Sequence, residues 1–243
     1  MKDNRKVFDN LYEYDFEACV YNLLNNIQCD LSHIDYDNKE SRNIQIGQMQ
    51  KENPVLKHVL SDGMKRLIRL YVKENNLKEE NLIWRQKDGF IVDKVLESTD
   101  ISFKLLFRKN ITKLIKSMDN KKLLILYMDN TVAIKGMIHK PLDTSFYKLM
   151  FNIDFSNRKK ILEGCEYLRK TFLSSTNANW FAREAKDGTI TIPMKGDTLL
   201  KISKSMLSNI DTTDIDKGII YSNYIYPFVQ TLLIQYNERE RRY

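Results

Sequence analysis

The sequence predicts an α+β protein with an antiparallel sheet backed by helices and a mostly helical C-terminal region. Long segments repeat apolar residues at helical spacing, whereas others are β-rich and joined by turn residues. Glycine and proline number only 8 and 4 among 243 residues, which favours helices over a turn-rich all-β fold. With 42% hydrophobic and 11% aromatic residues, the chain can build a sizeable core.

The first elements predicted are a short strand and two helices. The strand ends near Asp15, and apolar residues at three-to-four spacing predict a helix from Ala18 onward. A second helix is predicted over 35–54, with Asp37 or Asn38 as its N-cap and a proline at its end.

A third helix and a hairpin follow. The apolar stripe of the helix runs from Val55 to Val72, and the pattern ends at the two asparagines after it. The stretch LIWRQKDGFIV, residues 82–92, has apolar flanks around a charged tip. It predicts a β-hairpin with Asp88-Gly89 as its turn. An isolated turn of this kind is most often simply solvated.

The second half begins with a segment over 101–118 that we expect to start extended and become helical. Residues 121–141 predict another hairpin, around Asp129-Asn130. Beyond residue 143 the pattern is mostly helical, with a short β-segment at 188–194. These patterns place a domain boundary between residues 142 and 143.

The formal net charge is +7, from 39 Lys and Arg against 32 Asp and Glu, which favours an anionic partner such as nucleic acid. No apolar run reaches membrane-span length, and the first ten residues lack a signal-peptide core, so we expect no membrane partner. Three cysteines and three histidines at non-ligand spacing favour reduced thiols in a cytoplasmic setting over a zinc site.

The order of the elements suggests phosphoryl chemistry. A carboxylate ends a strand at Asp15, a helix follows with Lys39, Arg42 and Asn43 on one face, and a second carboxylate, Asp88, sits at a hairpin tip. In a nucleotidyl-transfer palm, carboxylates at two such positions hold Mg²⁺ (or Mn²⁺), while helix cations contact the triphosphate.

Four segments, in order, resemble those of family B DNA polymerases. YDFEACVY is similar to the first palm motif, and RQKDGFIV to the third, with Lys87-Asp88-Gly89 over its Thr-Asp-Gly portion. NKKLLILYMDNTVAIKGMIHKPLDT resembles the Lys-Lys-Arg-Tyr strand and the Lys-Gly segment after it. YSNYIYPFVQTLLIQY, with Pro227, is similar to the terminal thumb helix.

The resemblance implies a minimal, phage- or virus-like DNA polymerase that works in the cytoplasm, or in the host cytoplasm if phage-encoded. It implies a palm over 1–142 with short fingers helices at about 36–76, a thumb-like region over 143–243, and no exonuclease domain upstream. Its implied partners are primer–template DNA, a dNTP and other replication proteins. It implies catalytic and metal-binding roles for Asp15 and Asp88. The nucleotide-binding residues would be Lys39, Arg42, Asn43 and Tyr21, and the nucleic-acid-binding residues Lys87, Lys121, Lys122 and Lys135.

Departures from the motifs leave alternatives open. Gln86 stands where the third motif has its first aspartate, and the finger motif keeps only the Lys39–Asn43 spacing. A polymerase-like fold that only binds nucleic acid, or assists a polymerase, therefore stays an alternative. A nucleic-acid ligase needs Lys-x-Asp-Gly, and Gln86 occupies the lysine position. Locally, Asp15 could be a helix N-cap and the charged helix face could be merely solvated.

Overall fold

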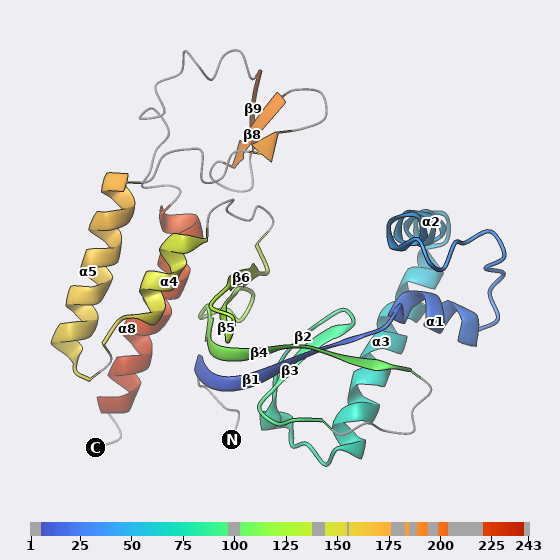
Figure 1. The fold of residues 1–243 in the computed structure, drawn as a ribbon, viewed down its shortest axis with the longest axis horizontal. Coiled ribbons are helices and arrows are strands. Elements are labelled where there is room, and N and C mark those ends of the chain that lie inside the picture. The colour runs from blue at the N-terminus through green and yellow to red at the C-terminus, as the bar shows by residue number, and fades with distance from the viewer. Residues whose placement is uncertain are drawn as a thin grey trace. The chain divides into compact units, whose positions relative to one another are not determined.

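The computed structural model describes residues 6–96, 103–137, 144–154, 156–175, 183–184, 189–193, 199–203 and 221–240 (Figure 1). It mixes helices and sheets, which confirms the predicted α+β class. One sheet has six strands in the order β2-β3-β1-β4-β5-β6, and another has three in the order β7-β8-β9. None of the described helices combines the length and apolar character that a membrane crossing requires.

The elements have the following bounds: β1 (Val7–Phe16), α1 (Cys19–Asn26), α2 (Lys39–Glu52), α3 (Pro54–Glu74), η1 (Glu79–Asn81), β2 (Leu82–Gln86), β3 (Gly89–Val92), β4 (Leu105–Lys116), β5 (Leu123–Tyr127), β6 (Val132–Lys135), α4 (Ser145–Phe151), α5 (Arg158–Ser175), β7 (Arg183–Glu184), β8 (Thr189–Pro193), β9 (Leu199–Ser203), the π-helical η5 (Tyr221–Ile225) and α8 (Tyr226–Glu240). The three helices predicted between residues 18 and 72, both hairpins and the β-segment near 190 are present. Asn38 is the N-cap of α2, since its side chain accepts a hydrogen bond from the Ser41 amide.

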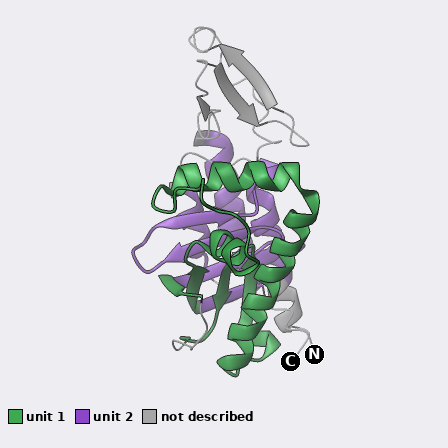
Figure 2. Ribbon diagram, turned by 90° about the vertical axis from the view of Figure 1, so that its right-hand side faces the viewer, with its two compact units in different colours: residues 1–3, 10–110 green, residues 4–9, 111–243 purple. Residues whose placement is uncertain are grey.

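Two compact units divide the chain (Figure 2). One contains Asn10–Asn110, and the other contains Asn4–Asp9 with Ile111–Tyr243. Strands β1 and β4 each contribute residues to both units. This division by contacts differs from the predicted boundary at 142–143, which concerned palm and thumb roles and stays a prediction.

The core of the first unit forms where β1 and β3 pack on α3. The even-numbered residues Tyr14 and Phe16 are buried in one cluster with Phe90, Leu67 and Ile68. Side chains alternate across a strand, so Asp15, between Tyr14 and Phe16, belongs to the opposite face of the sheet. The alternation therefore places the Asp15 carboxylate on the face of the sheet opposite the apolar core.

The β2–β3 hairpin has a different turn from the one predicted. Gln86 pairs with Gly89 across the ladder, so the two turn residues are Lys87 and Asp88, and not Asp88 and Gly89. Lys87 takes the positive φ, at 53°. A positive φ at the first turn residue is the type II′ requirement, which glycine meets most easily, so Lys87 carries backbone strain.

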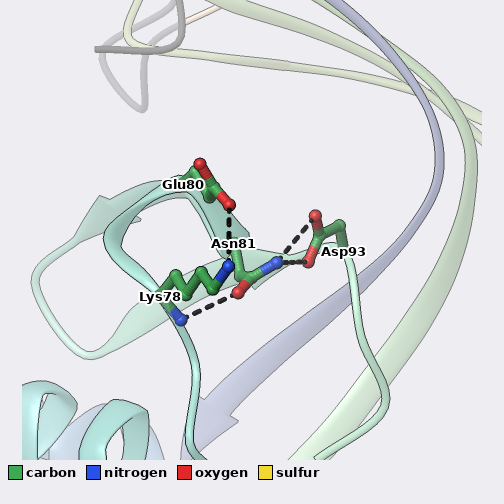
Figure 3. A network of polar contacts seen from close by, with 4 residues as sticks. All are labelled: Lys78, Glu80, Asn81 and Asp93. Atoms are coloured by element: carbon green, nitrogen blue, oxygen red, sulfur yellow. Dashed lines mark hydrogen bonds and ion pairs between the residues drawn. The ribbon is translucent and has the colours of Figure 1, made fainter. Parts of the chain in front are cut away.

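At its base, the same hairpin is fastened by the buried side chain of Asn81 (Figure 3). Its amide nitrogen donates to both carboxylate oxygens of Asp93, at 2.9 and 3.1 Å, and its oxygen accepts from the Lys78 amide at 2.8 Å. The Asp93 amide donates in turn to the Asn81 carbonyl. These bonds fix the start of β2 against the end of β3, and therefore the register of the hairpin.

The segment 101–118 corrects a sequence-based expectation, because its regular part is the strand β4 and not a helix. The β4–β5 register shifts between Ile111 and Lys113, which is the mark of a bulge. Across this shift the buried residues fall at Ile111, Leu114 and Ile115. Three- and four-residue spacing is the pattern of a helix, so the bulge made this strand resemble one.

In the second unit, β4–β6 pack with α4, α5 and α8 around one apolar cluster. Its fully buried members include Tyr147, Phe172 and Phe228. Thr231 on α8 donates from Oγ1 to the Lys116 carbonyl at 2.9 Å, which satisfies a buried hydroxyl and ties the helix to the strand.

Gly136, just after β6, is required by close packing. Its φ is 77°, and a Cβ at this position would lie 1.8 Å from the Lys121 carbonyl oxygen. We predict that Gly136→Ala lowers the free energy of unfolding by about 2 kcal/mol or more, because the backbone must move or strain. Chemical denaturation followed by circular dichroism would measure the change.

Gly47→Ala is the matched control. Nothing lies within 4 Å of a Cβ at Gly47, in the middle of α2. Alanine should stabilise this helix by up to about 1 kcal/mol. Equal effects of the two substitutions would show that the approach of residue 136 to Lys121 is wrong.

Candidate active site

Strand pairing places Asp15 and Asp88 beside each other. Asp15 is the direct cross-strand partner of Gly89, and Gly89 is the partner of Gln86. Asp88 is therefore one residue from the partner of Asp15, at the hairpin tip. Asp15, Gly89 and Gln86 therefore lie side by side in one row on three neighbouring strands and share one face of the sheet. Gly89, which has no side chain, lies between Asp15 and Gln86. A Cβ at Gly89 would make ordinary van der Waals contacts with the Tyr14 and Gln86 backbone oxygens, at 3.7 and 3.8 Å, so glycine is not required there for space.

The Asp15 carboxylate is half satisfied. Its Oδ2 accepts a hydrogen bond and ion pair from Arg108 Nη2 of β4, at 3.0 Å. Its Oδ1 is buried and has no hydrogen-bond partner among the described residues. A buried oxygen without a donor is costly unless a ligand or ion completes it. The alternative that Asp15 caps a helix is wrong, because Ala18 is the N-cap of α1 and no side chain caps it.

Negative charge accumulates around these two carboxylates. Burial, and then the charge of Asp15, raise the pKa of the half-buried Asp88 above its ordinary value, although Lys87 and Arg108 partly oppose this. Burial, together with the charges of Asp88 and Asp15, raises the pKa of the Cys19 thiol to about 12. The buried Cys19 thiol is therefore neutral at physiological pH and is not a nucleophile.

The donor chemistry of the pair fits a hard divalent cation. Mg²⁺ prefers oxygen ligands, and the unpartnered Oδ1 of Asp15 beside Asp88 offers them. Within the described part of the chain, no three His, Cys, Asp or Glu side chains gather closely enough to hold a metal ion. The remaining ligands would have to be water or substrate phosphates, as is usual for magnesium.

Two of the predicted nucleotide-binding residues, Tyr21 and Arg42, both contact the ring of a further residue, Tyr36. Tyr21 of α1 contacts the ring of Tyr36 edge-on, with centroids 4.9 Å apart. The Arg42 guanidinium lies over the same ring at 5.1 Å and also donates to the Tyr36 carbonyl. Tyr36 itself is 40% exposed. The group Tyr21–Tyr36–Arg42 is therefore a partly open cation–π cluster.

The remaining predicted residues are dispersed. Lys39 and Asn43 are exposed on α2, while Ile46 on the same helix is buried and anchors it. Lys87 is exposed at the strained turn beside Asp88.

The other three predicted lysines belong to the second unit. Lys121 and Lys122 directly precede β5. Lys135 is the last residue of the neighbouring strand β6, where it pairs with Leu123 of β5. Their predicted contact with nucleic acid stays a prediction.

Sequence reasoning missed two residues at these sites. Arg108 lies in the segment that we expected to turn helical, so the pattern gave no reason to place it opposite Asp15. Tyr36 stands directly before the predicted cap of α2 in DYDNKE, between two aspartates. An aromatic in so polar a stretch was the available signal for Tyr36, whereas only long-range pairing identifies Arg108.

Comparisons with known proteins give weak structural likeness and no sequence match. No protein-family model matches the chain, and no curated protein sequence matches it. Among solved structures, the family B DNA polymerase of the hyperthermophilic archaeon Pyrobaculum calidifontis is similar, with a TM-score of 0.37 and 9% identity. The match covers 93% of this chain and 45% of the polymerase, so the chain spans less than half of that protein's length.

The raised pKa of Asp88 predicts that removing its charge stabilises the fold, by an amount that depends on pH. A carboxyl with a raised folded-state pKa stabilises the fold at low pH, and this contribution is lost as pH rises through that pKa. In metal-free buffer, Asp88→Asn should therefore be more stable than wild type at neutral pH, by less than about 1 kcal/mol because the group is only half-buried. The gain should shrink as pH falls through the raised pKa and vanish below about pH 3, where the carboxyl is protonated in both the folded and unfolded states.

Asp119→Asn is the control with opposite sign. Although partial burial opposes it, hydrogen bonds from Ser117 and the Lys121 amide hold the pKa of Asp119 below its usual value. Its contribution is present at neutral pH and is lost on acidification, so Asp119→Asn should lower stability at pH 7. Thermal unfolding between pH 2 and 8 measures both. A loss of stability in Asp88→Asn at pH 7 would contradict the crowding of charge at the candidate site.

Proposed function

We propose that the chain performs template-directed nucleotidyl transfer with a minimal palm of the family B DNA polymerase type. The observation that carries the proposal is the pairing of β1 with β3, which sets Asp15 beside Asp88 at a hairpin tip. The motif resemblance at 14–21 and 85–92 supports the same assignment, since both carboxylates belong to it. On this proposal β1–β6 serve as the palm, α2 and α3 as reduced fingers, and the region after 143 as the thumb.

Each residue has a defined task in this proposal. Asp15 and Asp88 would hold Mg²⁺ or Mn²⁺, which when bound neutralises charge on the attacking and leaving oxygens. Gly89 would leave no side chain between the two strands in the way of the substrate phosphates. The neutral Cys19 would add no charge beside the carboxylates. Burial lowers the local dielectric, so the carboxylates act more strongly on a bound cation than they would in water.

Basic residues supply the rest of the proposed interface. Lys39, Arg42, Asn43 and Tyr21 would contact the dNTP, and Lys87, Lys121, Lys122 and Lys135 the primer–template DNA. Contacts from lysine and arginine to phosphates release counterions, so DNA affinity should fall steeply with salt.

A second candidate is a catalytically inactive module that binds nucleic acid or assists other replication proteins. The presence of Gln86 in the row with Asp15 favours it, because a neutral amide cannot replace a carboxylate at a metal. A ligase finds less support, since Gln86 occupies its lysine position and Lys87 lies at the turn itself.

Extension of a labelled primer on a DNA template with dNTPs and Mg²⁺ or Mn²⁺ separates the two candidates. We expect wild type to incorporate nucleotides. Asp15→Asn and Asp88→Asn should each reduce incorporation by about a thousandfold, because each keeps the shape and removes a charge that stabilises the transition state. DNA affinity should change little, since the basic residues are untouched.

Asp62→Asn is the matched control for these variants. Asp62 is an exposed carboxylate that pairs with Lys65 on α3, away from both strands, so its loss should leave incorporation unchanged. Wild type that binds DNA tightly yet incorporates nothing with either metal would reject the enzyme and favour the binding module. Full activity in Asp88→Asn would reject the assignment of Asp88.

A further inference from the structure

Arg108 contacts the carboxylate on which the proposed metal site depends. Its Nη2 lies 3.0 Å from Asp15 Oδ2, while the other oxygen of Asp15 is buried and unpartnered. The guanidinium charge also reaches Asp88. Two cations, Lys87 at the hairpin tip and Arg108 on the strand next to β1, therefore act on these carboxylates, and Arg108 is the one in contact with Asp15.

Arg108 can leave this ion pair at little cost in stability. The side chains of Arg108 and Asp15 are 43% and 31% exposed, and partly exposed ion pairs contribute little to stability. The guanidinium is always charged, so it cannot neutralise itself when a divalent cation enters beside it. A cation at Asp15 Oδ1 and Arg108 at Oδ2 would repel each other across one carboxylate.

A phosphate ligand resolves this conflict. Arginine's planar donors match phosphate oxygens bidentately, and such bonds are stronger than neutral ones. A triphosphate carries enough negative charge to accept both a metal ion and a guanidinium. It would therefore draw Arg108 from Asp15 at the moment when the metal needs that carboxylate.

We propose that Arg108 is an internal counter-ion of Asp15 that moves to a phosphate oxygen when a metal-bound nucleoside triphosphate enters. The inference rests on the proposed nucleotidyl transfer and names the group that couples metal to substrate at that site. Without substrate, Arg108 keeps metal affinity low. With substrate, the same charge contributes to binding of the triphosphate.

A neighbouring ion pair offers a matched control. Lys104 Nζ lies 3.1 Å from Glu17 Oε2. In the sequence, Lys104 is four residues before Arg108, and Glu17 is two residues after Asp15. Lys104→Ala removes one positive charge and one exposed ion pair close to the site without touching Asp15. Arg108→Lys keeps the charge and removes the bidentate fork.

Two titrations of the full chain test the proposal. Binding of Mn²⁺ alone is followed by electron paramagnetic resonance, and binding of dATP with Mg²⁺ by calorimetry. Arg108→Ala should raise Mn²⁺ affinity about tenfold, because a positive charge near the metal is lost. It should lower dATP affinity about tenfold or more, because a charge-assisted contact is lost. Arg108→Lys should keep weak Mn²⁺ binding with intermediate dATP affinity, and Lys104→Ala should match wild type in both.

The opposed signs separate this role from a structural one. If Arg108 merely holds Asp15 in place, Arg108→Ala weakens both ligands, and that result overturns the proposal. Unchanged affinities overturn it as well. Primer extension by wild type is scored separately. Active wild type with unchanged affinities rejects only the role of Arg108, whereas opposed shifts in an inactive protein reject polymerisation and support the coupled metal–triphosphate site.

Discussion

The register between β1 and β3 is the constraint on which the candidate site depends. With Tyr14 opposite Phe90 and Asp15 opposite Gly89, the aromatic rings enter the core on α3 and the carboxylate emerges on the other face. A slip of one residue would bury Asp15 among aromatics and expose them, which is energetically forbidding. The hydrogen bond from the Leu96 amide to the Tyr14 hydroxyl joins the chain after β3 to β1 and supports this register. The Asn81 network fixes the register of the adjoining β2–β3 hairpin (Figure 3).

Once the register is set, electrostatics determine what the site can bind. Arg108 and Lys87 oppose the charges of the two carboxylates, and one oxygen of Asp15 has no donor among the described residues. Burial adds to the cost of the charge on Asp88, since it raises the pKa of this carboxyl. Because the charges of the empty site are unfavourable, the site is stabilised most by a cation that binds together with its own anionic partner. A metal-bound triphosphate is such a ligand, which is why charge and proposed function agree.

Local signals predicted most of the fold from sequence. The cap at Asn38, the apolar stripe of α3 and the turn at Asp129-Asn130 depend on signals over a few residues, and the structure has each of them. Asp15 and Asp88 were singled out for the same reason, since each ends a strand pattern.

Features that need distant pairing could not be predicted. The bulge at Ile111–Lys113 gave a strand the spacing of a helix, and Arg108 acquires its role only when β4 lies beside β1. The positive φ of Lys87, next to a glycine that does not take it, is fixed by the ladder and not by turn preference. Tertiary pairing overrides local propensity at these positions.

Titration of the Asp88 carboxyl by carbon-detected NMR, in wild type and in Asp15→Asn without metal, tests the central claim most directly. If the two carboxylates share one site, the pKa of Asp88 lies above its ordinary value in wild type and falls in Asp15→Asn, while Glu17→Gln changes it little. An Asp88 pKa that is the same in wild type and Asp15→Asn would show that the two groups do not meet, and would contradict the account.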